Sequence, residues 1–500
     1  MNRAPLLCAI TLTLFAPGST RAETAAPASP AVAALPVTPV LTLEECVARA
    51  LDRNFSIEIQ RYSSSSAREG LIEADAAFDS SVALNTTDGY SRSAALGNIV
   101  SGSQRDSAST VLSVSRKIEA GTTFAVSTNL ASNKSGGGGT PLNPAFNGAL
   151  ALNVTQPLLK GAGSEINLAP RQLAQYGVVA ADASLKSSVL TVISGVESAY
   201  FNLAFAREQL GVRQFTLKVA QQLLDENQIR RSTGVLTDLE VLQAEVGVAN
   251  AQQNLLLADQ TLHNSEDALL QLIGRFEFDQ TLGAVKLPDD PVPAVSVANS
   301  YSLAKTGQPD YVTARALLKE SEINVRIAKD SLRPQLNLGG GLGLNSLEGS
   351  YGNVVDQLPS GRGYDWQLSL SLTFPWGFRA ENARYRQAIA ALDSQQAALG
   401  QIDQNLLVQV RTAVRNVLTS QESVANTALS RQLSEKQYEL EKARFDAGLD
   451  TFRFVQDAED ALGTARIAEL QARVSLRTAL AQLASLEGSS LARYRIKLKE

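Results

Sequence analysis

Apolar residues recur along parts of the chain in alternating steps of three and four, which is the spacing of a helix that packs along one side. Two long stretches show this pattern, and only Arg213 interrupts the first. A mean spacing of about 3.5 residues requires left-handed supercoiling around a neighbouring helix. The pattern therefore predicts coiled-coil helices. The positions are Val189, Val192, Val196, Ala199, Leu203, Ala206, Leu210, Leu217, Ala220 and Leu224, and then Leu406, Val410, Ala413, Val417, Val424 and Ala428.

Proline is absent from two long segments, 171–287 and 376–500. Because proline interrupts helices, these segments favour uninterrupted helix. We expect long helices of roughly 100 Å, at ~1.5 Å per residue. Each is about as long as the two shorter helices of its half of the chain placed end to end. The simplest packing stacks each short pair beside a long helix, with all strands at one end and two tight turns at the other. The expected helices are 43–75, 165–232, 238–273, 297–331, 380–446 and 451–487.

Six other runs alternate apolar or threonine residues with small polar ones, and Gly, Asn, Asp or Ser bounds each run, which is typical of strands joined by turns. Soluble β-sandwiches share this pattern, but a strand of ~10 residues is also long enough to cross an outer membrane. The runs are 82–86, 110–114, 122–128, 150–154, 336–344 and 366–374, within strand regions 78–157 and 335–375.

The two halves of the chain match each other at constant offsets, which indicates an internal duplication. Arg230, Gly234 and Glu245 recur 214 positions later as Arg444, Gly448 and Glu459, and residues upstream recur 254 positions later. Each half reads as helix, strands, long helix, tight turn, helix. We therefore expect a first repeat at 42–290 with a tip turn at 230–237, a second at 291–488 with a tip turn at 444–451, and a C-terminal tail at 489–500.

The N-terminus predicts export. Residues 1–22 have a basic start, an apolar run and small residues before Ala22, which is the layout of a signal peptide. Residues 23–41 are rich in Ala and Pro and are expected to form a flexible leader. Cleavage near Ala22 leaves Cys46 as the only cysteine, expected to be buried on an apolar helical face.

Composition argues against an enzyme. The 500 residues include one histidine and two cysteines, and the formal net charge is −5. A multi-histidine metal site is excluded, no basic block suggests nucleic acid, and no cofactor is expected. The glycines at 339–343 lack a following helix and suit a small-residue strand better than a phosphate loop. His263 is expected to be a packing or surface residue.

Four features together resemble the TolC-like outer membrane efflux protein family, over about Leu41 to Leu486. They are the opening helix from Leu43 to Leu51 followed by Asn54, the strand-to-helix corners at Gln156-Pro157 and Phe374-Pro375, the two tip turns, and the duplicated order. This resemblance implies a mainly α fold with long coiled-coil helices forming a periplasmic α-barrel, plus a transmembrane β-barrel, in a homotrimer. It also implies an outer-membrane exit duct of a tripartite efflux or type I secretion system. Its partners would be outer membrane lipid, a periplasmic adaptor protein and an inner-membrane pump.

The resemblance places a gate at the tips. The family has two aspartates after the second turn glycine; here the equivalent residues are Phe454 and Asp457. The first tip presents Asp238 and Glu240. A ring of acids at a constriction would attract cations; alternatively, these acids are solvated first-turn residues that favour helix N-termini. In a third interpretation, Arg444 and Arg453 pair with the acids and hold the tip shut.

The tip turns are also where an adaptor could reach the channel. Gly234 and Gly448 are expected to adopt positive φ in these turns, next to Arg230 and Arg444. The apolar residues beside them are either adaptor contacts or buried between protomers: Val235, Leu236 and Leu449.

Two points stay open at this stage. The first half has four strand-like runs where the family pattern has two, so the extra pair at 107–134 is either an extracellular hairpin or additional barrel wall. A periplasmic adaptor-like scaffold is the alternative function, although an adaptor should carry one helical hairpin flanked by compact β domains.

Overall fold

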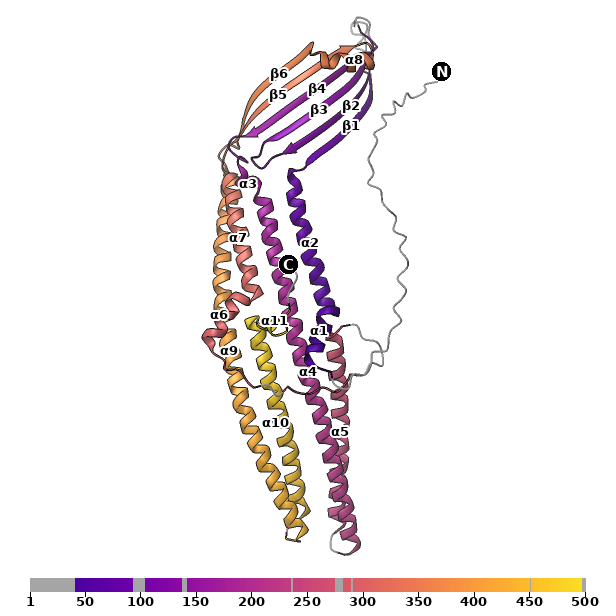
Figure 1. Ribbon diagram of the computed structural model, residues 1–500, viewed down its shortest axis with the longest axis vertical. Helices are drawn as coiled ribbons and strands as arrows, with labels where there is room; N and C mark the ends of the chain where they lie inside the picture. The colour runs from indigo at the N-terminus through magenta and orange to yellow at the C-terminus, as the bar shows by residue number, and fades with distance from the viewer. Residues whose placement is uncertain are drawn as a thin grey trace, which may run out of the picture.

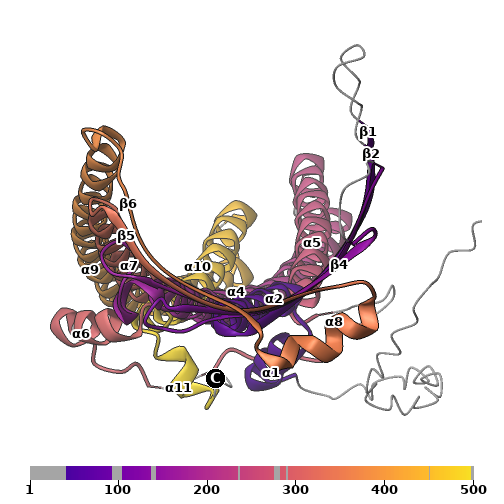
Figure 2. The ribbon, with the colours of Figure 1, turned by 90° about the horizontal axis from the view of Figure 1, so that it is seen from above.

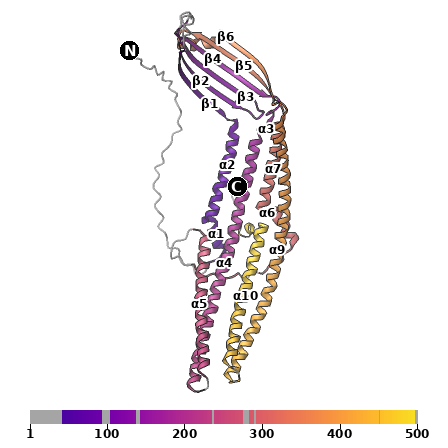
Figure 3. The same cartoon turned by 180° about the vertical axis from the view of Figure 1, so that it is seen from behind.

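The computed structural model describes residues 41–92, 104–136, 142–234, 237–274, 282–288, 291–449 and 451–496. The predicted signal peptide and the first 18 residues of the predicted leader (23–40) lie outside these ranges. The molecule is elongated, with a curved sheet at one end and two helical hairpins at the other (Figures 1 and 3). The predicted combination of long helices with a smaller β part is confirmed.

The two halves of the chain share the order of two helices, strands, a long helix and a further helix, with four strands in the first half and two in the second. The first half contains α1 (Leu43–Arg53), α2 (Phe55–Asp75), η1 (Ala76–Phe78), β1 (Ser80–Arg92), β2 (Gln104–Lys117), β3 (Thr123–Ser135), β4 (Ala145–Pro157), α3 (Ser164–Asn167), α4 (Ala169–Ser232) and α5 (Asp238–Leu272). The second half contains α6 (Val297–Gly307), α7 (Pro309–Asp330), β5 (Gln335–Glu348), α8 (Tyr351–Gln357), η2 (Leu358–Ser360), β6 (Gly363–Thr373), α9 (Arg379–Asp446), α10 (Phe452–Glu487) and α11 (Ser490–Arg493).

The first helix of each half is broken, where the sequence pattern predicted one continuous helix. Asn54 has extended backbone (ψ 124°) and ends α1 while capping α2, because its side chain accepts a hydrogen bond from Ser56 N at 2.9 Å. In the second half the break falls at Gln308 (ψ 120°), since the residue before Pro309 is disfavoured in helical conformation. A helix cap in the first half and a proline in the second therefore break the two helices at equivalent places.

The main core lies at mid-height, where α1 and the ends of α5 and α10 meet α4. Cys46 is fully buried there, as expected, and a capping box between Thr42 and Glu45 begins α1. Leu41, which the sequence pattern placed in the leader, is buried, and its N–H donates to Ala284 O at 2.7 Å.

The C-terminal tail also joins this core. Tyr494 Oη donates a hydrogen bond to Glu197 Oε1 at 2.6 Å, and Arg493 lies 3.7 Å from the same oxygen. Glu197 is buried, so this carboxylate ties α11 to the middle of α4. Among the described helices, only α4 is long and apolar enough to span a membrane by length and composition, and most of its apolar stretch is buried inside the chain.

The predicted apolar seam of α4 holds in its upper part and shifts near the tip. Val189, Val196 and Leu203 are buried, but Leu217, Ala220 and Leu224 are only half-buried, and Val219 and Leu223 take their place in the interior. The buried face rotates because α4 packs against α1, α2 and α7 above mid-height and between α5 and α10 below it.

All six strands form one antiparallel sheet in the order β1-β2-β3-β4-β5-β6. Seen from above, the sheet and the helices below it curve in the same direction (Figure 2). Helices α1, α6, α8 and α11 lie on the convex side of this curve, and the concave side faces away from them.

Asn54 links two helices that are stacked end to end, because its Nδ2 also donates to Leu272 O at 3.0 Å. We therefore expect Asn54→Ala to destabilise the protein by about 1–2 kcal/mol, the loss of one helix cap and one tertiary hydrogen bond. Thermal unfolding followed by circular dichroism measures this. Gln308→Ala is the matched control, since the Gln308 side chain makes no capping hydrogen bond to the backbone of α7 and only a long one, 3.5 Å, to exposed Asp310; equal losses in both variants would contradict the assignment.

Candidate functional site

The sheet separates apolar from polar side chains between its two faces. One register row crosses all six strands on the face that includes Val82, and every residue in it is apolar and exposed. That row consists of Val82, Val114, Val126, Leu152, Leu342 and Trp366. The next row on the opposite face consists of Ser81, Ser115, Ala125, Asn153, Gly341 and Gln367.

Helix α8 shows which face is which. Val354 of α8 is fully buried against the sheet, close to Gly148, which shares a face with Leu152 four residues further along β4. Because α8 lies on the convex side, the apolar face is convex and the polar face is concave (Figure 2). In a water-soluble protein, the apolar face of such a curved sheet would be the concave one and the polar face the convex one.

The glycine run at 339–343 lies inside β5, as a small-residue strand, which rules out the phosphate-loop interpretation. A Cβ at Gly343 would come within 2.5 Å of Asp365 Oδ1 on β6. Side chains of β6 therefore lie flat over the glycines of β5 on the concave face.

The strands join the helices at the two predicted proline corners. Pro157 is the last residue of β4, and Pro375 follows β6. Phe374 and Phe378 stack across the second corner with ring centroids 6.1 Å apart, and Phe378 adopts a left-handed φ of 48°. Both corners redirect a strand into a long helix.

The two hairpin turns form in the predicted places. Gly234 and Gly448 have positive φ, 81° and 72°. In the second turn Leu449 N donates to Arg444 O (2.9 Å) and Gly448 N to Phe445 O (3.0 Å), which is a Schellman motif. Val235 and Leu236 lie outside the described residues. Leu449 is exposed at the end of its hairpin.

The acidic candidates differ in what they contact. Glu240 reaches back to Thr237 N at 2.7 Å in a capping box, and Asp238 pairs with Arg231 at 2.5 Å. Both acids lie in the first turn of α5, where the second of the interpretations offered above expects them. Asp457 lies 3.8 Å from Arg453 on its own helix, on an exposed surface beside exposed Phe454.

Arg230 connects the two hairpins. Its guanidinium lies 4.1 Å from the centroid of the Phe445 ring and 3.9 Å from Asp446 Oδ1, both at the end of α9. Arg444, its counterpart in the second repeat, lies 3.7 Å from Glu441 of its own helix. A small apolar cluster supports the crossing: Val219, Leu223, Ala244, Phe445 and Val455.

Glu459 is a buried acid near the tip that the sequence pattern marked only as the counterpart of Glu245. It is 7% exposed, and its Oε1 has no hydrogen-bond partner in the described part of the chain. Burial, with a smaller contribution from Asp460, raises the pKa of Glu459 to about 7. Its position next to Ala458, within the apolar spacing of Val455 and Leu462, is the signal that could have identified it.

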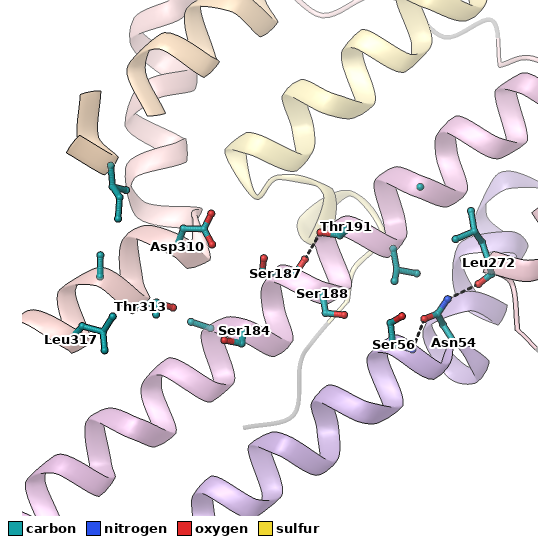
Figure 4. A pocket seen from close by; sticks show the side chains of 15 residues that line it. Asn54, Ser56, Ser184, Ser187, Ser188, Thr191, Leu272, Asp310, Thr313 and Leu317 are labelled. Atoms are coloured by element: carbon teal, nitrogen blue, oxygen red, sulfur yellow. Dashed lines mark hydrogen bonds between the residues drawn. The ribbon is translucent and has the colours of Figure 1, made fainter. Parts of the chain in front are cut away.

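A recess of about 720 Å³ lies between α2, α4 and α7, near the joint at Asn54 (Figure 4). Hydroxyl groups of α4 line it, and Thr191 Oγ1 donates to Ser187 O at 2.9 Å. Asp310 is the only ionisable residue in its lining.

His263 is exposed on α5. Across the described ranges, no three His, Cys, Asp or Glu side chains are grouped to hold a metal ion.

Comparison with known proteins finds a matching family model and similar chains. The family model described as outer membrane efflux protein matches residues 46–275 and 300–489. The pyoverdine export outer membrane protein OpmQ of Pseudomonas aeruginosa is 30% identical over 58% of this chain, and the match spans 61% of that relative. The match thus covers less than two thirds of the relative's length.

Solved channels share the fold. The outer-membrane channel OprN superposes with a TM-score of 0.67 at 18% identity, covering 89% of each chain. The CmeC outer membrane channel of Campylobacter jejuni gives the same TM-score and identity, covering 89% of this chain and 85% of that one.

The raised pKa of Glu459 predicts a pH-dependent stability. Below pH 4.5 the carboxyl is protonated in both the folded and the unfolded state; between pH 4.5 and about 7 the folded state holds a proton that the unfolded state releases, so stability falls as pH rises. Glu459→Gln should leave the unfolding free energy unchanged at pH 4 and raise it at pH 8 by up to about 3 kcal/mol.

Thermal or denaturant unfolding at the two pH values measures this difference. Glu245→Gln is the matched control, because Glu245 is exposed, and it should show no pH-dependent gain. An equal effect of Glu459→Gln at pH 4 and pH 8 would show that the carboxyl is not buried as described.

Proposed function

Because the chain belongs to the outer membrane efflux protein family, and so resides in the outer membrane and extends into the periplasm, we propose that three copies form the exit duct of a tripartite efflux or type I secretion system. The duct passively conducts cargo from an inner-membrane pump to the outside. No step in this function requires a catalytic group or a cofactor.

The observation that carries the proposal is the distribution of apolar and polar side chains over the two faces of the sheet. Its convex face is apolar and exposed, while its concave face bears Ser, Asn, Ala and Gly. Lipid on the outside and water on the inside satisfy this arrangement. Strands of 11–14 residues are long enough to cross the hydrocarbon layer.

The edges of the sheet support a ring. Within the described residues β1 and β6 each pair with one strand only, so each leaves a row of backbone groups without a partner strand. Such groups are costly in lipid, and closure into a barrel pairs them. Joining β6 of one copy to β1 of the next closes the sheet without any change within the protomer.

The helical part of the protomer also supports a ring, through the apolar surface on its two flanks. One flank of the protomer is formed by α2 and α5 and the other by α9. Exposed apolar residues follow both flanks, and ring closure buries them against each other. On α5 they are Leu239, Leu242, Val246, Leu256 and Leu257, and on α9 they are Val408, Leu418, Leu429, Leu433 and Leu440.

The tips are the proposed docking end. The turns at Gly234 and Gly448 lie at the far end from the sheet, where a periplasmic adaptor and the pump would meet the duct. Exposed Leu449 is a candidate adaptor contact, and Asp457 with Phe454 is the candidate constriction. An adaptor-like scaffold is disfavoured, because this chain has two hairpins and a membrane-length sheet.

Neighbouring residues on β4 test the orientation of the wall. Leu152→Lys places a charge toward lipid and should cost about 2–4 kcal/mol per protomer near the bilayer midplane, so fewer heat-modifiable trimers should be recovered from outer-membrane fractions. Asn153→Lys faces the lumen and should insert normally while moving the reversal potential in planar bilayers toward anions. Equal tolerance of the two lysines would overturn the assignment of the faces.

The gate assignment predicts a second electrical change. Three copies of Asp457 at a constriction favour cations, so Asp457→Ala should lower the cation preference of single channels. Because the acids would also hold permeating cations at the constriction, the same variant should raise the single-channel conductance. Asp238→Ala is the comparison and should change both quantities less, since Arg231 lies 2.5 Å from Asp238, closer than the 3.8 Å between Arg453 and Asp457. Unaltered conductance and selectivity in Asp457→Ala would remove this residue from the gate.

A further inference from the structure

The extra strand pair of the first half is part of the wall. Strands β2 and β3 lie between β1 and β4 and pair with them along their full length, from Ser80 opposite Arg116 to Arg92 opposite Gln104, and from Thr123 opposite Thr155 to Asn133 opposite Ala145. The sequence left two options open for this pair, and an extracellular hairpin would not pair with both neighbours in this way.

The side chains of the pair follow the same division as the rest of the sheet. Leu112 and Val114 of β2 and Phe124 and Val126 of β3 are exposed on the convex face. Their neighbours on the concave face are small and polar, such as Ser113 opposite Ser127. This is the pattern of two lipid-facing strands.

The turn of the pair is attached to the corner where β4 becomes helix. Gly163 N donates to Ala120 O at 3.2 Å, and Thr122 Oγ1 donates to Gln156 Oε1. Gly121 has a φ of 92°, and a Cβ there would meet Gly161 O at 2.7 Å, so the turn fits closely against the corner. The pair is therefore held at its lower end as well as along its length.

We propose that the assembled barrel has eighteen strands, six from each of three copies, and that the β2–β3 hairpin widens the duct in the outer membrane. This inference rests on the proposed ring of three. Barrel diameter grows roughly linearly with strand number, so the hairpin increases it about 1.5-fold over a barrel with four strands from each copy. The hairpin adds no helix, so only the membrane part widens.

The wall chemistry fits a wide aqueous passage. Gly339, Gly341 and Gly343 face the lumen on β5, and serine, asparagine and alanine face it on the other strands. Most of these side chains are small and project little into the lumen, and the larger Asp365 and Gln367 of β6 lie over the glycines of β5, so the barrel accepts bulky hydrophilic cargo, including polypeptide chains. The size limit of the duct then lies in the helices and tips.

Pulsed electron paramagnetic resonance tests the width directly. Ala151→Cys carries one nitroxide label on the concave face of β4 in each copy. Cys46 does not compete, because burial raises the pKa of its thiol to about 12. At a strand spacing of about 4.8 Å and a tilt of about 40°, eighteen strands separate equivalent backbone positions of three copies by about 31 Å, and twelve strands by about 21 Å.

Deleting residues 104–136 supplies the matched comparison. The deletion joins the upper ends of β1 and β4, which are already antiparallel, with Val82 and Leu152 on the same face. The labelled full-length trimer in lipid should show the longer distance, and the deletion variant a distance about 1.5-fold shorter. Should the deletion variant fail to assemble, the full-length distance alone distinguishes the two widths.

The possible results separate the two proposals. A full-length distance near 21 Å, or one that the deletion does not change, overturns the eighteen-stranded barrel while leaving the exit duct intact. Absence of a dipolar signal between labels in full-length protein from outer-membrane fractions means that no ring forms, which overturns the proposed function as well.

Discussion

The structure depends on one constraint: the chain makes more apolar surface and more strand edge than it can bury by itself. The convex face of the sheet has a continuous apolar row from Val82 to Trp366, and the two outer strands are each paired on one side. Neither feature is stable in water for a single copy. Lipid covers such a face in the outer membrane, and the proposed ring would pair the edges, so one set of unfavourable surfaces accounts for both membrane insertion and the proposed ring closure.

Helix and strand positions were readable from the sequence because each depends on local chemistry. The absence of proline, the 3.5-residue spacing and the turn glycines locate the long helices to within a residue or two at the tips, where α4 ends at Ser232 and α5 begins at Asp238. Breaks were missed because they depend on single residues. Asn54 ends a helix through a tertiary hydrogen bond to Leu272 O, which no periodicity can reveal.

The candidate site was less predictable, because its chemistry depends on which helix packs beside which. The acids at the first tip could be listed from the sequence, and the Thr237–Glu240 capping box is a local motif, but only the folded hairpin shows that Arg231 pairs with Asp238. The burial of Glu459 was missed because the duplication pairs it with Glu245, which is exposed, and the apolar spacing around Glu459 was the local signal for it. The duplication makes the two residues equivalent in sequence, and the different neighbours leave Glu245 exposed and Glu459 buried.

Differences between equivalent residues of the two repeats also determine how the two hairpins contact each other at the tips. In the first repeat Arg230 reaches the Phe445 ring and Asp446 of the second hairpin, so the two hairpins of one copy are tied together. In a ring, the duplication would direct Arg444 toward the next copy, where the residues equivalent to Phe445 and Asp446 are Arg231 and Ser232. A guanidinium cannot replace an aromatic ring and a carboxylate as a partner for arginine. In the proposed ring of three copies, contacts within a copy would therefore be stronger than the equivalent contacts between copies, and the duplicated tip would have threefold rather than sixfold symmetry.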